Sequence, residues 1–368
     1  MTRLVLALGT SAGGVGRHVR MLAEGLAARG HEVVVAGPRD TEEAFGFTGA
    51  GAEFAEVPIA DRPSAADLRS IVRLRRAARG AGAVHAHGLR AGALASLALL
   101  GARRRPRLVV TLHNAVTAAG VVGVVYRVLE RIVARRAGHV LVVSPDLGAR
   151  MRALGARRVS SAVVPAPPLG APERGPEQVR ADLERLLPGA GADRPILLTV
   201  ARLAQQKGLE TLLDAAAGPY KGDPLFMIAG DGPLRPRLQA RIDAERLPVI
   251  LYGWARTPDL LQVAHAVIVP SRWEGQPLSV QESLRAGRPI IATRVGGIPG
   301  MVGDAGLLVP PEDPGALARE IGRLLGDPAL AARLADAAAR RGAGLAGEAE
   351  AVAAVLDAYG LPAGDGAA

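Results

Sequence analysis

The chain has 368 residues, more than one hydrophobic core usually supports, so we expect two domains. Hydrophobic residues make up 49% and predict a globular protein, whereas aromatic residues make up only 3%, which argues against a base-stacking platform or an aromatic-lined sugar site. There is no cysteine, which excludes disulfides and thiolate metal sites.

The net charge of +10 is unevenly distributed along the chain. Residues 1–165 carry 24 Arg and Lys against 11 Asp and Glu, whereas the remaining residues carry 21 against 24. This asymmetry predicts an acidic partner for the first half, such as a lipid headgroup, a phosphorylated acceptor or a nucleic acid. The apolar run at residues 4–8 is too short for a signal peptide, and no stretch approaches the ~20 apolar residues that span a bilayer. We therefore expect a soluble, cytoplasmic protein.

Short apolar runs alternate with helix-length segments, a pattern typical of βαβ units around parallel sheets. Strands are predicted in the first half at residues 3–9, 32–37, 83–88, 107–113 and 139–144. Proline and glycine at both ends of residues 166–194 predict a linker that contains one or two helical turns. A second series of strands is predicted at residues 196–202, 224–232, 249–254, 266–271, 289–297 and 306–311.

This alternation predicts an α/β fold with two Rossmann-like domains, residues 1–165 and 195–345, that face each other across a cleft. Residues 346–368 are expected to form a C-terminal helix, which can pack back on the first domain, and a tail.

The first predicted strand runs into GTSAGGVGRHV, where Gly13, Gly14 and Gly16 precede a helical pattern. Glycines between a strand and a helix let the backbone approach a phosphate, whose charge is favourable at a helix N-terminus. A dinucleotide-binding motif fits poorly, because Val19 stands where its third glycine or alanine belongs and the next strand does not end in an acid. A tight turn without a ligand is the alternative, but the number of glycines favours ligand contact.

Arg202 and Lys207, in VARLAQQKG, follow the first strand of the second series and open a helix. Ligands bind at the carboxyl ends of parallel strands in such folds, where two cations can neutralise a diphosphate. A solvated helix start is the alternative, but cations have the wrong sign to stabilise a helix N-terminus, which favours a bound anion. Gly230 and Gly232, in AGDGP, predict a second loop through which the backbone approaches a ligand.

Glu274 and Glu282 lie eight positions apart in EGQPLSVQE. We place Glu274 in a loop and Glu282 on the following helix, where a carboxylate can accept two hydrogen bonds from a vicinal diol such as ribose. Two exposed acids are the alternative, since exposure is the common state of glutamate. A retaining glycosidase would also need two carboxylates, but that function leaves Arg202, Lys207 and the glycine loops unexplained.

EGQPLSVQE resembles the Glu-x7-Glu motif of the retaining GT-B glycosyltransferases, in particular family 4. VARLAQQKG resembles the phosphate-binding Arg/Lys motif of that family, and AGDGP and RAGRPIIATRVGGIPGMV resemble its neighbouring segments. The resemblance covers most of the chain and implies a GT-B enzyme that moves a sugar, with retention, from a UDP- or GDP-linked donor to a hydroxyl acceptor. Residues 1–165 would bind the acceptor and residues 195–345 the nucleotide sugar.

The resemblance also implies roles for single residues. Glu282 would hold the donor ribose, Glu274 would contact the transferred sugar, and Arg202 and Lys207 would hold the diphosphate. Further donor contacts would come from three segments, with Gly13, Gly14, Gly16, Gly230, Gly275, Gln276, Pro277 and Leu278. Gln276 stands where many members have an aromatic or bulky apolar residue, which leaves the donor sugar open. No Asp-x-Asp pair with metal-ligand character appears, so no obligatory metal or cofactor is expected besides the donor.

His113, in TLHN, resembles the family's histidine at the end of a strand in the first domain, and it would orient the donor sugar from the acceptor side. His85 and His87, in VHAHG, are expected on opposite faces of their strand, so that one lines the cleft and the two form no metal pair. In the family's usual same-face mechanism the departing phosphate takes the acceptor's proton, so no dedicated protein base is expected.

The acceptor is the part that the sequence determines least. Residues 66–79 predict a basic amphipathic helix that carries five arginines beside Leu68, Ile71 and Val72. Some family members with lipid acceptors dock on membranes through such a helix. A peripheral contact with the anionic inner face of the plasma membrane, and an anionic or lipid acceptor in cell-envelope glycoconjugate synthesis, are therefore one option. A solvated helix face is the other.

Two alternative functions belong to other classes. A nucleic-acid-binding protein is compatible with the basic first half, but no nucleic-acid-binding motif is present. A non-catalytic sugar-nucleotide binder is disfavoured because Glu274, Glu282, Arg202 and Lys207 are all retained.

Overall fold

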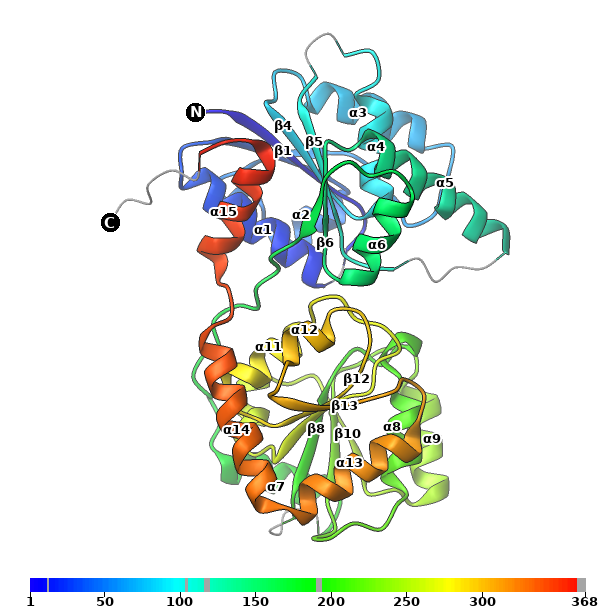
Figure 1. The fold of residues 1–368 in the computed structure, drawn as a ribbon, viewed down its shortest axis with the longest axis vertical. Helices are drawn as coiled ribbons and strands as arrows, with labels where there is room; N and C mark the ends of the chain where they lie inside the picture. The colour runs from blue at the N-terminus through cyan, green and yellow to red at the C-terminus, as the bar shows by residue number, and fades with distance from the viewer. Residues whose placement is uncertain (12, 103–104, 116–119, 190–193, 363–368) are drawn as a thin grey trace. The chain divides into compact units, whose positions relative to one another are not determined.

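The computed structural model describes residues 1–11, 13–102, 105–115, 120–189 and 194–362. The chain forms two compact units, Met1–Pro165 together with Ala346–Ala368, and Ala166–Leu345. Each unit is built around one parallel β-sheet with helices on both faces (Figure 1). The prediction of two Rossmann-like α/β domains is confirmed. The tail is predicted at residues 359–368; Tyr359 belongs to a helix instead, and residues 363–368 lie outside the described residues.

The first unit contains, in its described residues, a seven-stranded parallel sheet with the order β3-β2-β1-β4-β5-β6-β7. Its strands are β1 (Arg3–Leu8), β2 (Glu32–Gly37), β3 (Glu53–Glu56), β4 (Ala83–His87), β5 (Arg107–Leu112), β6 (His139–Val142) and β7 (Val159–Ser161). Its helical segments are α1 (Gly14–Ala27), α2 (Arg39–Phe45), η1 (Thr48–Ala50), α3 (Asp67–Ala77), α4 (Leu89–Ala98), α5 (Gly120–Arg136), α6 (Pro145–Ala153) and α15 (Glu348–Tyr359).

The helices of the first unit divide between the two faces of the sheet. α1 and α15 pack together on one face, and α3, α4 and α5 pack side by side on the other (Figure 1). The central strands β1, β4 and β5 are therefore buried from both sides, which explains their nearly continuous apolar sequences.

The register of the central strands brings chemically active residues to one edge of this sheet. Leu8 at the end of β1 pairs with His87 at the end of β4, and His87 pairs with Thr111 near the end of β5. The strand order reverses between β1 and β4, and such a switch point is where open α/β sheets bind ligands.

The second unit contains, in its described residues, a six-stranded parallel sheet with the order β10-β9-β8-β11-β12-β13. Its strands are β8 (Ile196–Val200), β9 (Leu225–Ala229), β10 (Val249–Gly253), β11 (Ala266–Val269), β12 (Ile290–Thr293) and β13 (Gly306–Val309). Its helical segments are α7 (Pro176–Leu186), η2 (Gln205–Lys207), α8 (Leu209–Ala216), α9 (Arg235–Glu245), α10 (Thr257–Leu261), α11 (Leu278–Arg285), α12 (Ile298–Val302), α13 (Pro314–Gly326) and α14 (Pro328–Ala343).

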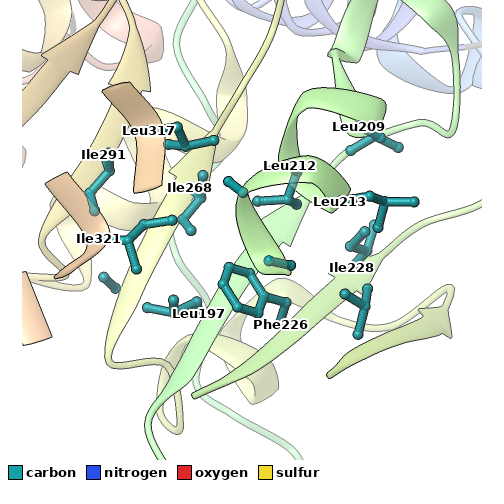
Figure 2. Packing of buried hydrophobic residues seen from close by; sticks show 14 of the residues in the cluster. Leu197, Leu209, Leu212, Leu213, Phe226, Ile228, Ile268, Ile291, Leu317 and Ile321 are labelled. Atoms are coloured by element: carbon teal, nitrogen blue, oxygen red, sulfur yellow. The ribbon is translucent and has the colours of Figure 1, made fainter. Parts of the chain in front are cut away.

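Alternate residues of the second sheet feed two separate hydrophobic clusters. Leu197 and Phe226 point to one face, where they pack against α8 and α13, as Figure 2 shows for Leu212 and Ile321. Their neighbours in β8 and β9 point to the other face, toward α7, α10, α11 and α14. Side chains alternate between the faces of a strand, so a sheet covered on both sides needs apolar residues at nearly every position.

In the described part of residues 166–194, where a linker with one or two helical turns is predicted, the chain forms the 11-residue helix α7 and belongs to the second unit. α7 packs into the core of the second unit through Val179 and Leu183, which are fully buried. The segment ahead of α7 is also held, because Gln281 accepts a hydrogen bond from the Ala166 amide at 2.8 Å and Arg285 donates to the Ala166 carbonyl at 2.7 Å. Proline and glycine mark the turns around one amphipathic helix here rather than a free connection.

The last described helix belongs to the first unit. α15 contacts α1 so closely that a Cβ on Gly25 would lie 2.5 Å from Val352 Cγ2. The Tyr359 hydroxyl reaches the interior of the unit and is 2.7 Å from His85 Nδ1. Among the described residues, no helix is both long and apolar enough to cross a membrane.

Candidate active site

Glu274 is a buried carboxylate in the loop between β11 and α11. Its side chain is 8% exposed, and its Oε1 accepts hydrogen bonds from the Lys207 ammonium at 2.6 Å and from the Ser271 hydroxyl at 2.8 Å. A buried carboxylate is costly unless it is paired and hydrogen-bonded, and this one is both. The alternative of an exposed acid is therefore wrong for Glu274.

Lys207 lies at the end of η2, in the loop that follows β8. It is one of only two lysines among the 45 basic residues of the chain. Its side chain is 24% exposed, and an ammonium has three N–H donors, so Lys207 can bind an anion while it donates to Glu274. Arg202 follows the same strand, is exposed, and makes no ion pair with any residue that the structure describes. Both predicted cations therefore lie beyond the carboxyl end of β8.

Glycines allow the loops of this site to pack closely against one another. A Cβ on Gly208, the residue after Lys207, would lie 2.1 Å from the Pro270 carbonyl oxygen, and a Cβ on Gly296 would lie 1.8 Å from the Glu274 carbonyl oxygen. Both glycines have positive φ angles, of 61° and 51°. The amide after Gly296, that of Gly297, donates to the Glu274 carbonyl at 3.0 Å. No other residue type fits these two positions without moving the loops.

Gly230 and Gly232 are also required because another backbone segment packs closely against them. A Cβ on Gly230 would lie 2.0 Å from the Ala201 carbonyl oxygen, and one on Gly232 would lie 2.5 Å from the Leu203 carbonyl oxygen. The loop after β9 therefore supports the loop that carries Arg202. Close backbone approach, which the sequence predicts toward a ligand, is made here toward the protein itself.

Glu282 lies in the second turn of α11 and is half-buried, between the buried neighbours Gln281 and Ser283. Pro277 is the N-cap of this helix. Four more predicted donor contacts lie in the loop ahead of α11 and at its first residue. Gly275 and Pro277 are buried, and Gln276 and Leu278 are half-buried. These residues, Glu274 and Lys207 all follow carboxyl ends of neighbouring parallel strands, where this fold class binds ligands.

The first unit has a cavity of about 550 Å³ beyond the carboxyl ends of β1, β4 and β5. The predicted residues Gly13, Gly14 and His113 line it, together with residues 60–62 and the start of α4. Gly16 does not line it, because a Cβ there would lie 2.1 Å from the Phe45 ring. Gly16 also allows α1 to pack against α2, and its donor contact stays a prediction.

Two histidines of the cavity wall contact each other. His87 Nδ1 and His113 Nε2 are 3.2 Å apart, at hydrogen-bond distance. The expectation that His85 and His87 lie on opposite faces of β4 is wrong, since residues two apart on a strand share a face. Their rings are 4.1 Å apart, and His85 lies behind His87, held by the hydroxyls of Tyr359 and Thr111 at 2.7 Å each.

Sequence reasoning missed His18, which completes this cluster. It lies on α1, and its ring meets those of His87 and His113 edge-on, with centroid distances of 5.7 Å in both cases. Its position, one turn after the glycine loop, was the available signal. Tyr359 was missed because nothing in the sequence pairs it with β4.

The four histidines are held in the neutral form. Burial lowers the pKa of His113 to about 4, and burial together with nearby histidines lowers that of His85 to about 3. The pKa values of His18 and His87 are also well below the usual range, through burial first and neighbouring histidines second. The cluster therefore offers neutral imidazoles rather than cations at pH 7. Across the described residues, no group of three or more His, Asp or Glu side chains is arranged to hold a metal ion.

Two family profiles match the chain. The profile described as glycosyl transferase 4-like domain matches residues 13–167, and the one described as glycosyl transferases group 1 matches residues 194–327. The chain belongs to the group 1 glycosyl transferases. The resemblance seen in the sequence motifs is thereby confirmed, and the matched regions cover most of both units of this glycosyl transferase family member.

Curated relatives match this family member in part. Alpha-D-kanosaminyltransferase of Streptomyces kanamyceticus is 37% identical over 156 residues, which are 40% of each chain. D-inositol 3-phosphate glycosyltransferase of Nocardiopsis dassonvillei is 30% identical over 245 residues, which are 61% of this chain and 56% of the relative. The chain thus spans about half the length, or less, of these relatives.

Solved structures match over the whole chain. HepE of Anabaena, in complex with UDP and glucose, has a TM-score of 0.79 at 19% identity and covers 98% of this chain and 99% of its own. Sucrose-phosphate synthase of Thermosynechococcus elongatus has a TM-score of 0.77 at 24% identity, with 98% of each chain covered. The predicted GT-B fold is therefore confirmed.

Proposed function

We propose that this protein transfers a sugar from a nucleoside-diphosphate sugar to a hydroxyl acceptor, with retention of the anomeric configuration. The observation that carries the proposal is the buried pair of Lys207 and Glu274 beyond the carboxyl ends of β8 and β11. The similar HepE structure in complex with UDP and glucose supports a UDP-linked donor, and a GDP-linked donor is the other option.

The pair has the groups that a nucleotide sugar requires. Both hydrogen bonds that described residues make to the Glu274 carboxylate go to Oε1, so Oε2 can accept a hydrogen bond from a hydroxyl of the transferred sugar. Lys207 has N–H donors left for phosphate oxygens, and the exposed Arg202 can add a second cation. Negative charge develops on the departing diphosphate during transfer, and fixed cations stabilise that charge in the transition state.

The remaining site residues take supporting roles in the proposal. Glu282 accepts hydrogen bonds from the donor ribose, and the loop of residues 275–278 surrounds the sugar. In the first unit, Gly13 and Gly14 let the backbone approach the donor, and His113 orients the sugar. The departing phosphate takes the acceptor's proton, so no protein base is assigned.

Nucleotide release from a panel of UDP- and GDP-sugars, each with a set of polyol acceptors, tests this function. Glu274→Gln should abolish transfer while UDP affinity changes little, because the carboxylate is assigned to the sugar. Lys207→Ala should weaken UDP binding by about 10- to 100-fold, the effect of losing a hydrogen bond to a charged group. Lys221→Ala is the matched control and should bind UDP like the native protein. Release from no donor would refute the proposal.

A labelling experiment on the native protein avoids any loss of stability in the variants. Lys207 and Lys221 are the only lysines, so an amine-reactive reagent has two side-chain targets. UDP should protect Lys207 and leave the reactivity of Lys221 unchanged, as read by peptide mass spectrometry. Equal labelling of Lys207 with and without UDP would contradict its phosphate contact.

We further propose that α3 docks on an anionic membrane, which would suit a lipid-linked acceptor of the cell envelope. Ser70 and Leu74 form its buried side, whereas Leu68 is 72% and Val72 50% exposed. Arg69, Arg76 and Arg79 make no ion pair with any described residue. Exposed apolar side chains beside free cations are the composition of an interfacial helix.

Flotation with phosphatidylglycerol-containing vesicles, and with neutral vesicles as the control, tests the docking. The variant Arg69→Gln/Arg76→Gln should lose binding. Arg73 and Arg75 are unsuitable, because Arg73 pairs with Glu56 at 3.0 Å and Arg75 donates to the Ala98 carbonyl at 2.8 Å. Leu68→Ser should also reduce binding, whereas Leu186→Ser, an exposed leucine of the second unit, should not. Equal binding to phosphatidylglycerol-containing and neutral vesicles would refute the docking.

A further inference from the structure

The cavity of the first unit contains a buried polar atom for which the described protein offers no partner. His87 lines the cavity, its side chain is 2% exposed, and its Nε2 makes no hydrogen bond with any described residue. Buried polar atoms in native proteins nearly always have a partner. A nitrogen in this position therefore points to a ligand group that supplies one.

The ring of His87 cannot turn away from the cavity. Its Nδ1 is engaged with His113 Nε2 at 3.2 Å, and the two rings are nearly parallel, with an interplanar angle of 22°. The His85 ring stacks behind it at 4.1 Å, and both nitrogens of His85 are already used by Tyr359 and Thr111. The His18 ring closes a third side. The direction of Nε2 is thus fixed by packing.

The contact between the two rings also couples their tautomers. If His87 Nδ1–H donates to His113 Nε2, then His87 Nε2 is an acceptor and His113 Nδ1 carries its proton. If His113 Nε2–H donates instead, then His87 Nε2 is a donor and His113 Nδ1 is an acceptor. In either state the pair presents one donor and one acceptor. A neutral hydroxyl both donates and accepts, so it can bind His87 Nε2 in either state. An ionised phosphate oxygen only accepts, so it can bind His87 Nε2 only in the second state, where this nitrogen is a donor.

A second part of the cavity wall, residues 60–62, is also held in place by hydrogen bonds. The buried Arg90 guanidinium binds Asp67 through two hydrogen bonds of 2.8 and 2.9 Å, and it donates to the carbonyls of Ala60 and Arg62 at 3.1 Å each. The Tyr126 hydroxyl donates to the Asp61 carbonyl at 2.7 Å. Residues 60–62 are therefore fixed at three consecutive carbonyls, so this part of the wall is held by the protein itself.

We propose that His87 contacts the acceptor: its Nε2 hydrogen-bonds one hydroxyl of a polyol ring, a sugar or a cyclitol, that occupies this cavity, and the bond to His113 sets which of the two rings donates. This inference rests on the proposed function and names the acceptor class and a residue that selects it. The cavity of about 550 Å³ is large enough for one such ring.

Two substitutions separate the two bonds of His87. The amide of asparagine lies near the position of Nδ1, so His87→Asn can keep the bond to His113 and loses the acceptor contact. The longer amide of glutamine lies near the position of Nε2, so His87→Gln can keep the acceptor contact and loses the bond to His113. His87→Asn should raise the acceptor KM about tenfold with the UDP affinity unchanged, and His87→Gln should restore the acceptor KM while kcat falls.

His139→Asn is the control for a merely structural effect. His139 is a buried histidine of the same unit, hydrogen-bonded to Ser160 at 2.6 Å, and it does not line the cavity. It should lower stability without a change in acceptor KM. If His87→Asn and His139→Asn behaved alike, or if the acceptor KM of His87→Asn equalled that of the native protein, the proposal would be overturned.

A second readout does not depend on turnover or on the folding of a variant. The chain has seven histidines, so long-range ¹H–¹⁵N spectra of native protein with labelled histidine resolve each ring. Titration with myo-inositol and with glucose should shift the His87 and His113 nitrogens together and leave His139 and His265 unmoved. Unshifted His87 nitrogens at saturating polyol would refute the contact. Shifts without any donor turnover would instead refute the proposed function and leave His87 as a polyol ligand.

Discussion

Acid should loosen the first unit at a pH that leaves the second intact. Four histidines of the first unit, His18, His85, His87 and His113, have pKa values lowered mainly by burial. An unfolded chain protonates its imidazoles as the pH falls through about 6.5, whereas the folded unit keeps these rings neutral. The unfolded state then binds more protons, so the free energy of unfolding decreases as the pH decreases. The second unit contains only His265.

The size of the decrease in the free energy of unfolding follows from the pKa values of His85 and His113. At pH 7.5 the histidines are neutral in both states and the effect vanishes. At pH 5, His85 and His113, with pKa values of about 3 and about 4, are still neutral when folded but protonated when unfolded. Each then costs about 2 kcal/mol, or ~4 kcal/mol together, and His18 and His87 act in the same direction. That is a large fraction of the ~5–15 kcal/mol that stabilises a typical domain.

Hydrogen exchange with mass spectrometry at pH 7.5 and pH 5 measures this loss of stability in the first unit, after the exchange rates are corrected for their intrinsic pH dependence. Peptides from β1, β4 and β5 should open roughly 1,000-fold more often at pH 5, the factor that corresponds to ~4 kcal/mol. Peptides from β8, β9 and β11 should change much less, because the second unit has a single histidine, His265, whose pKa is also lowered by burial. The fluorescence of Trp254 and Trp273, both in the second unit, is an independent control.

The variant His85→Gln should remove about 2 kcal/mol of the pH dependence of the first unit, since it deletes one of the two rings. Equal loss of protection in both units, or a first unit whose protection is independent of pH, would refute the reasoning that the buried rings resist protonation.

Three further substitutions test other contacts. Gly296→Ala places a Cβ 1.8 Å from the Glu274 carbonyl oxygen at a residue with a positive φ. It should lower the free energy of unfolding by about 2 kcal/mol or more, measured by urea unfolding, and weaken UDP binding, measured by calorimetry. Native values of both quantities would contradict the close contact. Tyr359→Phe leaves His85 Nδ1 without its partner and should cost about 1–3 kcal/mol, seen as faster exchange in β4 and β5 but not in β8. Arg90→Lys cannot reproduce the planar fork, so residues 60–67 should exchange faster while the central strands stay protected; unchanged exchange in that loop would show that Arg90 does not hold it.

The strands were predictable wherever both faces of a sheet are covered. β1, β4 and β5 are almost entirely buried, and the resulting apolar runs stand out in the sequence. Two strands, β3 and β7, escaped prediction because they form the edges of their sheet and are half-exposed or exposed along their length. The length of the helix within residues 166–194 was underestimated because an amphipathic helix between proline-rich turns has the composition of a connection.

The candidate site was predictable as a set of residues and not as a set of contacts. Motifs identified Glu274 and Lys207 separately, but their pairing depends on the close packing of two loops that are far apart in the sequence. His18 and Tyr359 reach the histidine cluster from helices at opposite ends of the chain. Such partners are fixed by the tertiary packing of α1 and α15, which leaves no local periodicity to read.

The position of α15 has a consequence for the order in which the protein can fold. The first unit draws part of its core from this helix, whose fully buried members include Ala351, Val352, Leu356 and Ala358. The second unit is contiguous in sequence, from Ala166 to Leu345, and leaves the ribosome before α15 does. Domains usually complete themselves from the N-terminus onward during synthesis. Here the first unit is completed only once α15 has been made, so a nascent chain carries the seven-stranded sheet without this covering helix throughout the synthesis of the second unit.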